Sequence, residues 1–201
     1  MGLAAPLWRR WPQTFDVTAV CIGTVMPDVV DGLVGATQGH LGQGVGHSLI
    51  GLALLCVPGG LALWFASRSI ARRFPLSEGT GFWARCRNAA LEEIWTARPF
   101  GAHAGVILFS LAIGTLSHLV TDVISHAECP WFYPWLENLH LFPGWWTHVW
   151  FRMPVPGYGS GYPFAPHFIS WLLLSVVGGW WLLKPVWSAT NAVPDGLPAE
   201  D

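Results

Sequence analysis

Long apolar stretches restrict the fold of this chain more than any other feature of its sequence. Three of them are long enough to cross a bilayer as helices, at about residues 47–66, 103–125 and 167–187, and a weaker candidate lies at about 15–34. Charged residues make up only 11% of the chain, whereas soluble domains usually contain about 25%. The sequence therefore predicts an all-α, polytopic membrane protein with about four transmembrane helices.

The other segments indicate one domain and exclude some classes of partner. We predict a single helical membrane domain over residues 1–190 and a disordered tail over 191–201. The long loop at 126–166 is rich in aromatic residues, as in an interfacial belt, and a lipid hydrolase would use the same belt as an entry surface. A net charge of −2 argues against nucleic acid as a partner. The four cysteines lack the C-x-x-C spacing of a thiolate zinc site.

The basic residues predict the orientation of the helices. All but one of the lysines and arginines precede the first helix, lie in the 67–102 connector or end the last helix: Arg9, Arg10, Arg68, Arg72, Arg73, Arg85, Arg87, Arg98 and Lys184. With four helices these charges share one side, which the positive-inside rule makes cytoplasmic. Both termini are then cytoplasmic, and the 35–46 and 126–166 loops face outward. No apolar segment follows Arg10, so no cleavable signal peptide is expected.

Metal-capable side chains collect at the predicted outer ends of all four helices. In chain order they are Asp28, Asp31, His47, His118, Asp122, His126 and His167. Ionisable groups in a membrane are costly, usually face the interior of the helix bundle and mark a functional site. Their common depth therefore favours one shared site that faces the outer membrane surface.

The segment "SHLVTDVISH" supplies one pair of ligands and leaves the role of a third residue open. His118 and Asp122 are four residues apart, so both can reach one ion from the same face of a helix. His126 lies about 12 Å of helix rise from His118. Either the helix ends near residue 125 and His126 folds back, or His126 serves a second ion or acts as acid and base. Imidazole and carboxylate ligands favour zinc, with manganese or iron as alternatives.

Each of these side chains also has a structural interpretation. His47 and His167 stand at helix starts, where polar side chains often serve as caps, and Asp31 can be a solvated helix end. His118 and Asp122 can instead form a buried hydrogen bond between helices. Two further residues are expected to have no part in the site: Asp16, a helix N-cap, and His103, on the cytoplasmic side.

The chain resembles a family of bacterial membrane proteins in four segments: "FDVTAVCIGTVMPDVVD", "GHSLIGLALLCVPGGLAL", "GTLSHLVTDVISH" and, more loosely, "YPFAPHFISWLLL". Members of this family are often labelled membrane-bound metal-dependent hydrolases, and the group includes the LexA-binding, inner membrane-associated hydrolases of unassigned activity. The resemblance implies a bacterial inner-membrane location. It also implies metal ligands at Asp28, His47, His118 and Asp122, with His126 and His167 as further members of the set.

One feature departs from that family. Relatives commonly begin with a Ser-His-Ala type segment before the stretch that "AAPLWRR" resembles, and its His would fall at or before Met1 here. Either the sequence starts late or a ligand has been lost, and a lost ligand would favour a structural role.

Two functions remain open on these observations, ahead of a third, a transporter with an intramembrane His/Asp relay, for which four helices without inverted repeats are poorly suited unless the protein oligomerises. The favoured one is metal-dependent hydrolysis of a phosphoester or acyl bond in an amphiphilic substrate, because the site lies at headgroup depth. Its predicted metal ligands are Asp28, His47, His118, Asp122 and His167, and His126 is its predicted acid/base residue. The alternative is a non-enzymatic accessory or assembly subunit of a larger membrane complex. The 14 tryptophans and the glycine patches at 58–60 and 176–179 would suit the close helix packing of such a subunit.

Overall fold

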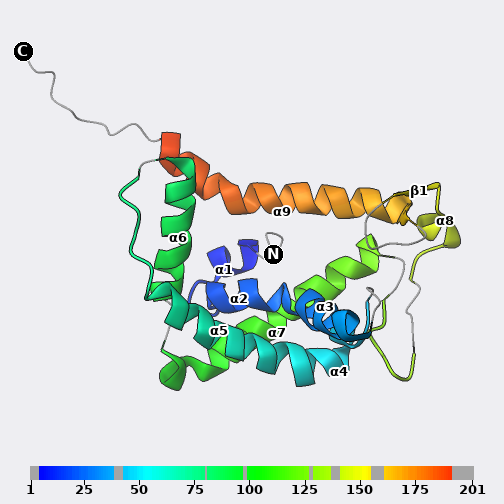
Figure 1. The fold of residues 1–201 in the computed structure, drawn as a ribbon, viewed down its shortest axis with the longest axis horizontal. Helices are drawn as coiled ribbons and strands as arrows, with labels where there is room; N and C mark the ends of the chain where they lie inside the picture. The colour runs from blue at the N-terminus through cyan, green and yellow to red at the C-terminus, as the bar shows by residue number, and fades with distance from the viewer. Residues whose placement is uncertain are drawn as a thin grey trace, which may run out of the picture.

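The computed structural model describes residues 5–38, 43–79, 81–96, 99–126, 129–136, 141–154 and 161–191. Within these ranges the chain is mostly helical, which confirms the predicted fold class (Figure 1). Its helices are α1 (Ala5–Arg10), α2 (Val17–Gly23), α3 (Met26–Gln38), α4 (Leu49–Gly51), α5 (Val57–Ala71), α6 (Phe82–Thr96), α7 (Phe100–Ser125), α8 (Gly144–Thr147) and α9 (Pro166–Asn191). A 3₁₀ turn, Val45–His47, and a π-helical turn, Leu52–Cys56, flank α4. Two short strands, β1 (Phe151–Met153) and β2 (Tyr162–Phe164), pair antiparallel.

Four helical segments of the described residues are long and apolar enough to cross a membrane, as predicted. They are Val17–Thr37, Leu49–Ala71, Phe100–Ser125 and Pro166–Lys184. The second span continues past the predicted end at residue 66. The Arg68 guanidinium lies 4.8 Å from the centre of the Trp64 ring, so the charge contacts an aromatic face and the stem of Arg68 adds to the apolar surface of the helix.

The two long connections contain regular structure that the sequence analysis did not predict. In the 67–102 connector, α6 consists largely of good helix formers such as alanine, leucine, glutamate and arginine. The Asn88 side chain of this helix bonds both the backbone N–H and the carbonyl of Ser77, which fixes the chain before the helix. The 126–166 loop contains α8 and the strand pair.

The first span consists of two helices because the chain breaks at Thr24 and Val25. Pro27 has no backbone N–H, so it cannot donate to the carbonyl of Gly23 four residues earlier. That carbonyl instead accepts a hydrogen bond from the hydroxyl of Thr115 on α7, at 3.0 Å. The break therefore frees backbone carbonyls of the first span to bond with α7.

The helices α2 and α7 cross with their backbones in direct contact. A Cβ added at Gly23 would lie 2.3 Å from the carbonyl oxygen of Leu111, and one added at Gly114 would lie 2.3 Å from that of Val20. Small residues permit such close approach of helices in membranes. Substitution of either glycine would push α2 and α7 apart, and with them Asp28, on the helix that follows α2, and His118, on α7.

A buried core lies between α2, α5 and α7, beside this crossing. Its members are Ala19, Ile22, Met26, Cys56, Trp64, Ile107 and Leu111. At the start of α2, Asp16 accepts a hydrogen bond from the Ala19 N–H at 2.8 Å, which confirms the predicted N-cap. The buried Nε1 of Trp64 donates to the same carboxylate oxygen at 3.3 Å.

The basic residues and the metal-capable aspartates and histidines lie toward opposite ends of the spans. Figure 1 shows α1, α6 and the last turns of α9 at one end, and α3, α4, α8 and the start of α9 at the other. The basic residues lie at or near the first end, except for Arg152 on β1 and for Arg98, which is outside the described residues. The aspartates and histidines considered below lie toward the second end.

Candidate metal centre

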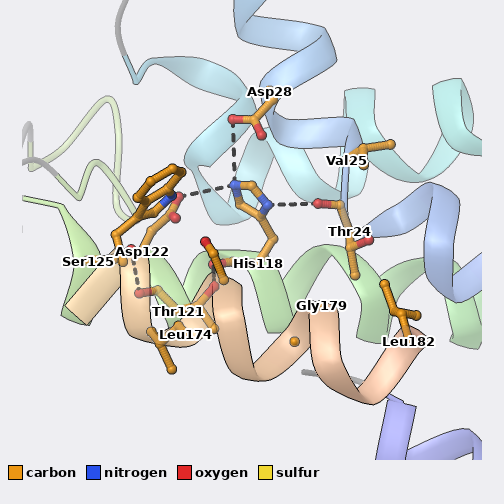
Figure 2. Close-up of a pocket in the computed structure, with 13 residues that line it drawn as sticks. Thr24, Val25, Asp28, His118, Thr121, Asp122, Ser125, Leu174, Gly179 and Leu182 are labelled. Carbon is orange, nitrogen blue, oxygen red and sulfur yellow. Dashed lines mark hydrogen bonds and ion pairs between the residues drawn. The ribbon is translucent and has the colours of Figure 1, made fainter. Parts of the chain in front are cut away.

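Four side chains from three segments of the chain meet at one point. Asp28 is on α3, His47 ends the turn before α4, and His118 and Asp122 are on consecutive turns of α7. The Nε2 atom of His47 lies 3.2 Å from Asp122 Oδ2, 3.5 Å from Asp28 Oδ1 and 3.3 Å from His118 Nε2. The Nε2 atom of His118 lies 3.3 Å from Asp122 Oδ2 and 3.6 Å from Asp28 Oδ1 (Figure 2). The structure thus brings together four of the five predicted metal ligands.

Each imidazole is oriented by a hydrogen bond on the far side of its ring. Nδ1 of His47 lies 2.6 Å from Oδ2 of Asp31, and Nδ1 of His118 lies 2.7 Å from the backbone carbonyl of Thr24. A carboxylate and a carbonyl can only accept, so both Nδ1 atoms carry a proton. In the neutral rings the Nε2 lone pairs then face each other and the two carboxylates. Histidines that bind metals are typically held in this way.

Taken three at a time, these atoms have the spacing of donors in the ligand shell of zinc. Donor atoms about 2.0–2.1 Å from a tetrahedral zinc ion lie about 3.3–3.4 Å from one another. The five separations given above range from 3.2 to 3.6 Å. They form two triangles that share the His47–His118 edge, one completed by Asp28 and the other by Asp122. Either set of three donors suits an imidazole- and carboxylate-binding ion.

Negative charge around His47 makes this point favourable for a cation. Carboxylate oxygens of Asp28, Asp31 and Asp122 lie within 3.5 Å of its ring nitrogens. Burial alone would lower the pKa of His47, but hydrogen bonds with Asp122, Asp28 and Asp31 raise it to about 11. Without a metal ion, His47 therefore holds a positive charge in the form of a proton.

The group is buried on one side and open on the other. The side chains of His47 and Asp122 are only 4% and 7% exposed, whereas that of Asp28 is 67% exposed. A catalytic metal site needs an open position in addition to its protein ligands. The exposed side of Asp28 provides access of that kind.

The two remaining predicted site residues lie farther out. The helix α7 ends at Ser125, and His126 folds back so that its Nδ1 lies 3.3 Å from Asp122 Oδ1 and 3.0 Å from Ser125 Oγ. This is the first of the arrangements that the sequence left open. His167 is buried, but its Nδ1 lies 3.4 Å from the carbonyl of Trp146. Among the described residues, the donor atoms that all lie within 4.8 Å of one another are those of Asp28, His47 and His118. The role of His167 as a ligand stays a prediction.

Asp31 contributes more to the site than the sequence indicated. It is buried, with 7% of its surface exposed, and is not a solvated helix end. Besides His47, its carboxylate accepts hydrogen bonds from the backbone N–H groups of Gly44 and Gly46, at 2.6 and 2.7 Å. A Cβ at Gly46 would lie 2.8 Å from Asp31 Oδ1, so the turn fits around this carboxylate. The sequence signal for this role was the three-residue spacing of Asp28 and Asp31, which places both carboxylates on one face of a helix.

Gln43 is a further residue of the site that the sequence analysis missed. Its Nε2 donates a hydrogen bond to Oδ2 of Asp122, at 2.9 Å. This is the oxygen that faces both imidazoles, so the amide helps to orient it. No motif in the sequence links residues 43 and 122, and the contact exists only because the turn before α4 packs against α7.

Comparison with known protein families supports a membrane location for the chain. The family model described as YdjM inner membrane protein matches residues 1–190. The chain belongs to the YdjM inner membrane protein family. As a YdjM family member with four candidate spans, it is a multi-pass inner membrane protein that associates with the lipid bilayer. No curated protein and no solved structure matches the chain.

The YdjM match confirms one part of the resemblance noted in the sequence. It supports membership of an inner membrane family and assigns no hydrolase activity. The matched range includes all four spans and every residue of the candidate metal centre. The centre therefore belongs to the part of the chain that the YdjM family model describes.

Proposed function

We propose that this protein is a membrane-embedded, zinc-dependent hydrolase, with manganese or iron as alternative metals. Asp28, His47, His118 and Asp122 would hold the ion. The observation that supports this most strongly is the convergence of two Nε2 atoms and two carboxylate oxygens within 3.2–3.6 Å of their neighbours. The Nδ1–H groups of His118 and His47 donate hydrogen bonds to the Thr24 carbonyl and the Asp31 carboxylate, so in the neutral rings both Nε2 atoms are acceptors. Two Nε2 atoms and two carboxylate oxygens then face one another with no donor among them, and only added protons or a metal cation can relieve their repulsion.

The side chains around the centre suit a hydrolytic reaction. A zinc ion held here would supply Lewis-acid activation of water and of the bond to be cleaved. His126 lies beside the centre, bonded to Asp122 through Nδ1, and its side chain is 32% exposed. It can therefore exchange a proton with the surroundings and with a molecule at the centre, as an acid/base residue must.

The position of the centre favours an amphiphilic substrate. His47 precedes the second span, His118 and Asp122 lie in the half of the third span that ends at Ser125, and Asp28 lies mid-way along the first span. We infer that the centre lies just below the lipid headgroups, within reach of the polar head of an amphiphile. The nearby loop is rich in exposed aromatic residues that suit an interface, including Trp135, Trp145 and Trp150. We infer that the cleaved bond is a phosphoester or acyl bond next to the polar head of such a molecule.

Metal removal tests this function directly. Purified wild-type protein should contain about one zinc ion per chain, because both triangles of donors use the same two Nε2 atoms and each of these has a single lone pair. Chelation should abolish hydrolysis of p-nitrophenyl phosphate and p-nitrophenyl ester probes, and added zinc should restore the activity for the bond class that is cleaved. Elemental analysis and absorbance measure the two quantities. Negligible zinc in the purified and the zinc-treated protein would refute the proposed function.

The basic residues at the opposite end support a centre that faces away from the cytoplasm. A membrane-impermeant maleimide should label a His148→Cys variant in intact spheroplasts, since His148 is exposed near α8. The native Cys86 on α6 should react only after the membrane is permeabilised. Mass spectrometry of the labelled peptides distinguishes the two cysteines. Labelling of Cys86 in intact spheroplasts would reverse the proposed orientation.

A further inference from the structure

A cavity of about 400 Å³ adjoins the candidate metal centre. It lies between the first span, α7 and α9, and three donor residues, Asp28, His118 and Asp122, form part of its wall. Figure 2 shows Asp122 and Ser125 toward one end, Thr24 and Leu182 toward the other, and His118 between them. The cavity therefore extends from the centre along the spans.

The two sides of the cavity differ in chemistry. The α7 side carries polar groups, from Thr121, Asp122 and Ser125. The α9 side is mostly apolar or small, with Leu174, Gly178, Gly179 and Leu182. From Trp171 to Leu182 this side follows α9 for about 16 Å, at the rise of an α-helix. Apart from the Ser175 hydroxyl and the indole N–H of Trp171, this wall is non-polar and offers a hydrocarbon chain contact along its length.

The helix that forms the apolar wall also borders the lipid. Leu173, Val176 and Trp180 on α9 are each at least 60% exposed, and the α9 span is the least buried of the four. In a bilayer these side chains contact acyl chains. A molecule already dissolved in the membrane can therefore reach the cavity beside α9 without crossing water.

We propose that this cavity holds the hydrocarbon chain of a single-chain amphiphile while its polar head lies at the metal centre. The inference rests on the proposed function and specifies its substrate class. A volume of about 400 Å³ is near the lower end of ligand pockets, which run from about 300 to 1,000 Å³, and so suits one chain better than two. The chain would point toward Leu182, deeper in the membrane than the centre.

Gly179 provides a precise way to block the chain without altering the centre. It lines the cavity, and a Cβ added there meets no atom within 4 Å. The Cβ of a larger side chain can therefore be added there without a clash, and the rest of that side chain would occupy the cavity. Gly105 on α7 is the matched control, because a Cβ there also meets nothing within 4 Å and the residue does not line the cavity.

The experiment uses full-length protein in phosphatidylcholine nanodiscs and a dodecylphosphonate that carries a diazirine at the end of its chain. After illumination, mass spectrometry maps the adducts, and zinc is measured in the same samples. In the wild type we expect adducts concentrated on cavity residues such as Val25 and Leu182. Excess unlabelled dodecylphosphonate should remove them, and methylphosphonate should not. Gly179→Trp should lose the adducts and keep its zinc, whereas Gly105→Trp should match the wild type.

The outcomes separate this inference from the proposed function. Zinc-containing wild type whose adducts are spread evenly over all lipid-facing helices would overturn the chain site and leave the metal centre intact. Cavity adducts in protein that binds no zinc would support the chain site and refute the hydrolase. A Gly179→Leu variant that also retains zinc guards against misfolding caused by tryptophan. Unchanged cavity adducts in both Gly179 variants, or cross-links to a second copy of the chain in their place, would overturn the inference.

Discussion

Replacement of His118 by alanine should abolish both zinc binding and hydrolysis. The variant loses a donor atom, His118 Nε2, whose three neighbours in the centre, Asp28 Oδ1, His47 Nε2 and Asp122 Oδ2, lie within 3.6 Å. Loss of an outer hydrogen-bond partner of a metal ligand alone costs about 10–100-fold in metal affinity, so loss of the ligand itself should cost more. Elemental analysis of the purified variant and turnover of the probe that the wild type cleaves measure the two effects.

His103→Ala is the matched control for this variant. His103 is on the same helix, 15 residues earlier, which corresponds to about 22 Å of helix rise. Zinc content and turnover should equal those of the wild type. If His118→Ala retains both properties as fully as His103→Ala does, the centre is not the site of catalysis. Stable co-purification with another membrane protein would then favour the accessory-subunit alternative.

The second large effect should come from Asp31→Asn, although Asp31 is not one of the four donors. Its carboxylate accepts from His47 Nδ1 and from the N–H groups of Gly44 and Gly46. An amide has only one accepting oxygen, so at least one of these bonds is lost, together with the negative charge that favours the cation. We expect zinc affinity to fall by about 10–100-fold, as for other residues that orient metal-binding histidines.

Competition with a chromophoric chelator measures this affinity in detergent solution. The control is Asp16→Asn, which makes the same chemical change at another buried aspartate. A single oxygen of Asp16 accepts from both Ala19 N–H and Trp64 Nε1, so an amide oxygen can keep both contacts. Its zinc affinity should stay at the wild-type value. An Asp31→Asn variant with wild-type affinity would show that the Asp31 contact does not control His47.

The features that could be predicted from the sequence are those that depend on one segment at a time. The apolar length of each span and the positions of the arginines gave the number of helices and the shared end for Asp28, His47, His118 and Asp122. These four side chains are neighbours in the structure, in agreement with the prediction that residues at a common depth form one shared site. The return of His126 to Asp122 followed from the end of α7 at Ser125, which the sequence had offered as one of several possibilities.

The features that could not be predicted depend on how segments cross. The Thr24 carbonyl reaches His118 because Pro27 interrupts the first span and α2 packs against α7. Gln43 reaches Asp122 only through the placement of the turn before α4. His167 shares the depth of the donors, yet its ring bonds the Trp146 carbonyl. Depth in the membrane follows from the order of residues along a helix, whereas the direction of a side chain around the helix requires the packing.

The glycine crossing of α2 and α7 determines which part of this molecule is free to move. Gly23 and Gly114 bring the backbones of α2 and α7 into contact, so these two helices cannot slide past each other without a steric collision. Asp28, just after α2, and His118, on α7, are thereby held in place relative to each other. The opposite wall of the cavity, α9, contributes none of the four donors and is the least buried span. We therefore expect that any widening of the cavity for a bulkier molecule comes from displacement of α9, which would leave the positions of the four donors relative to one another unchanged.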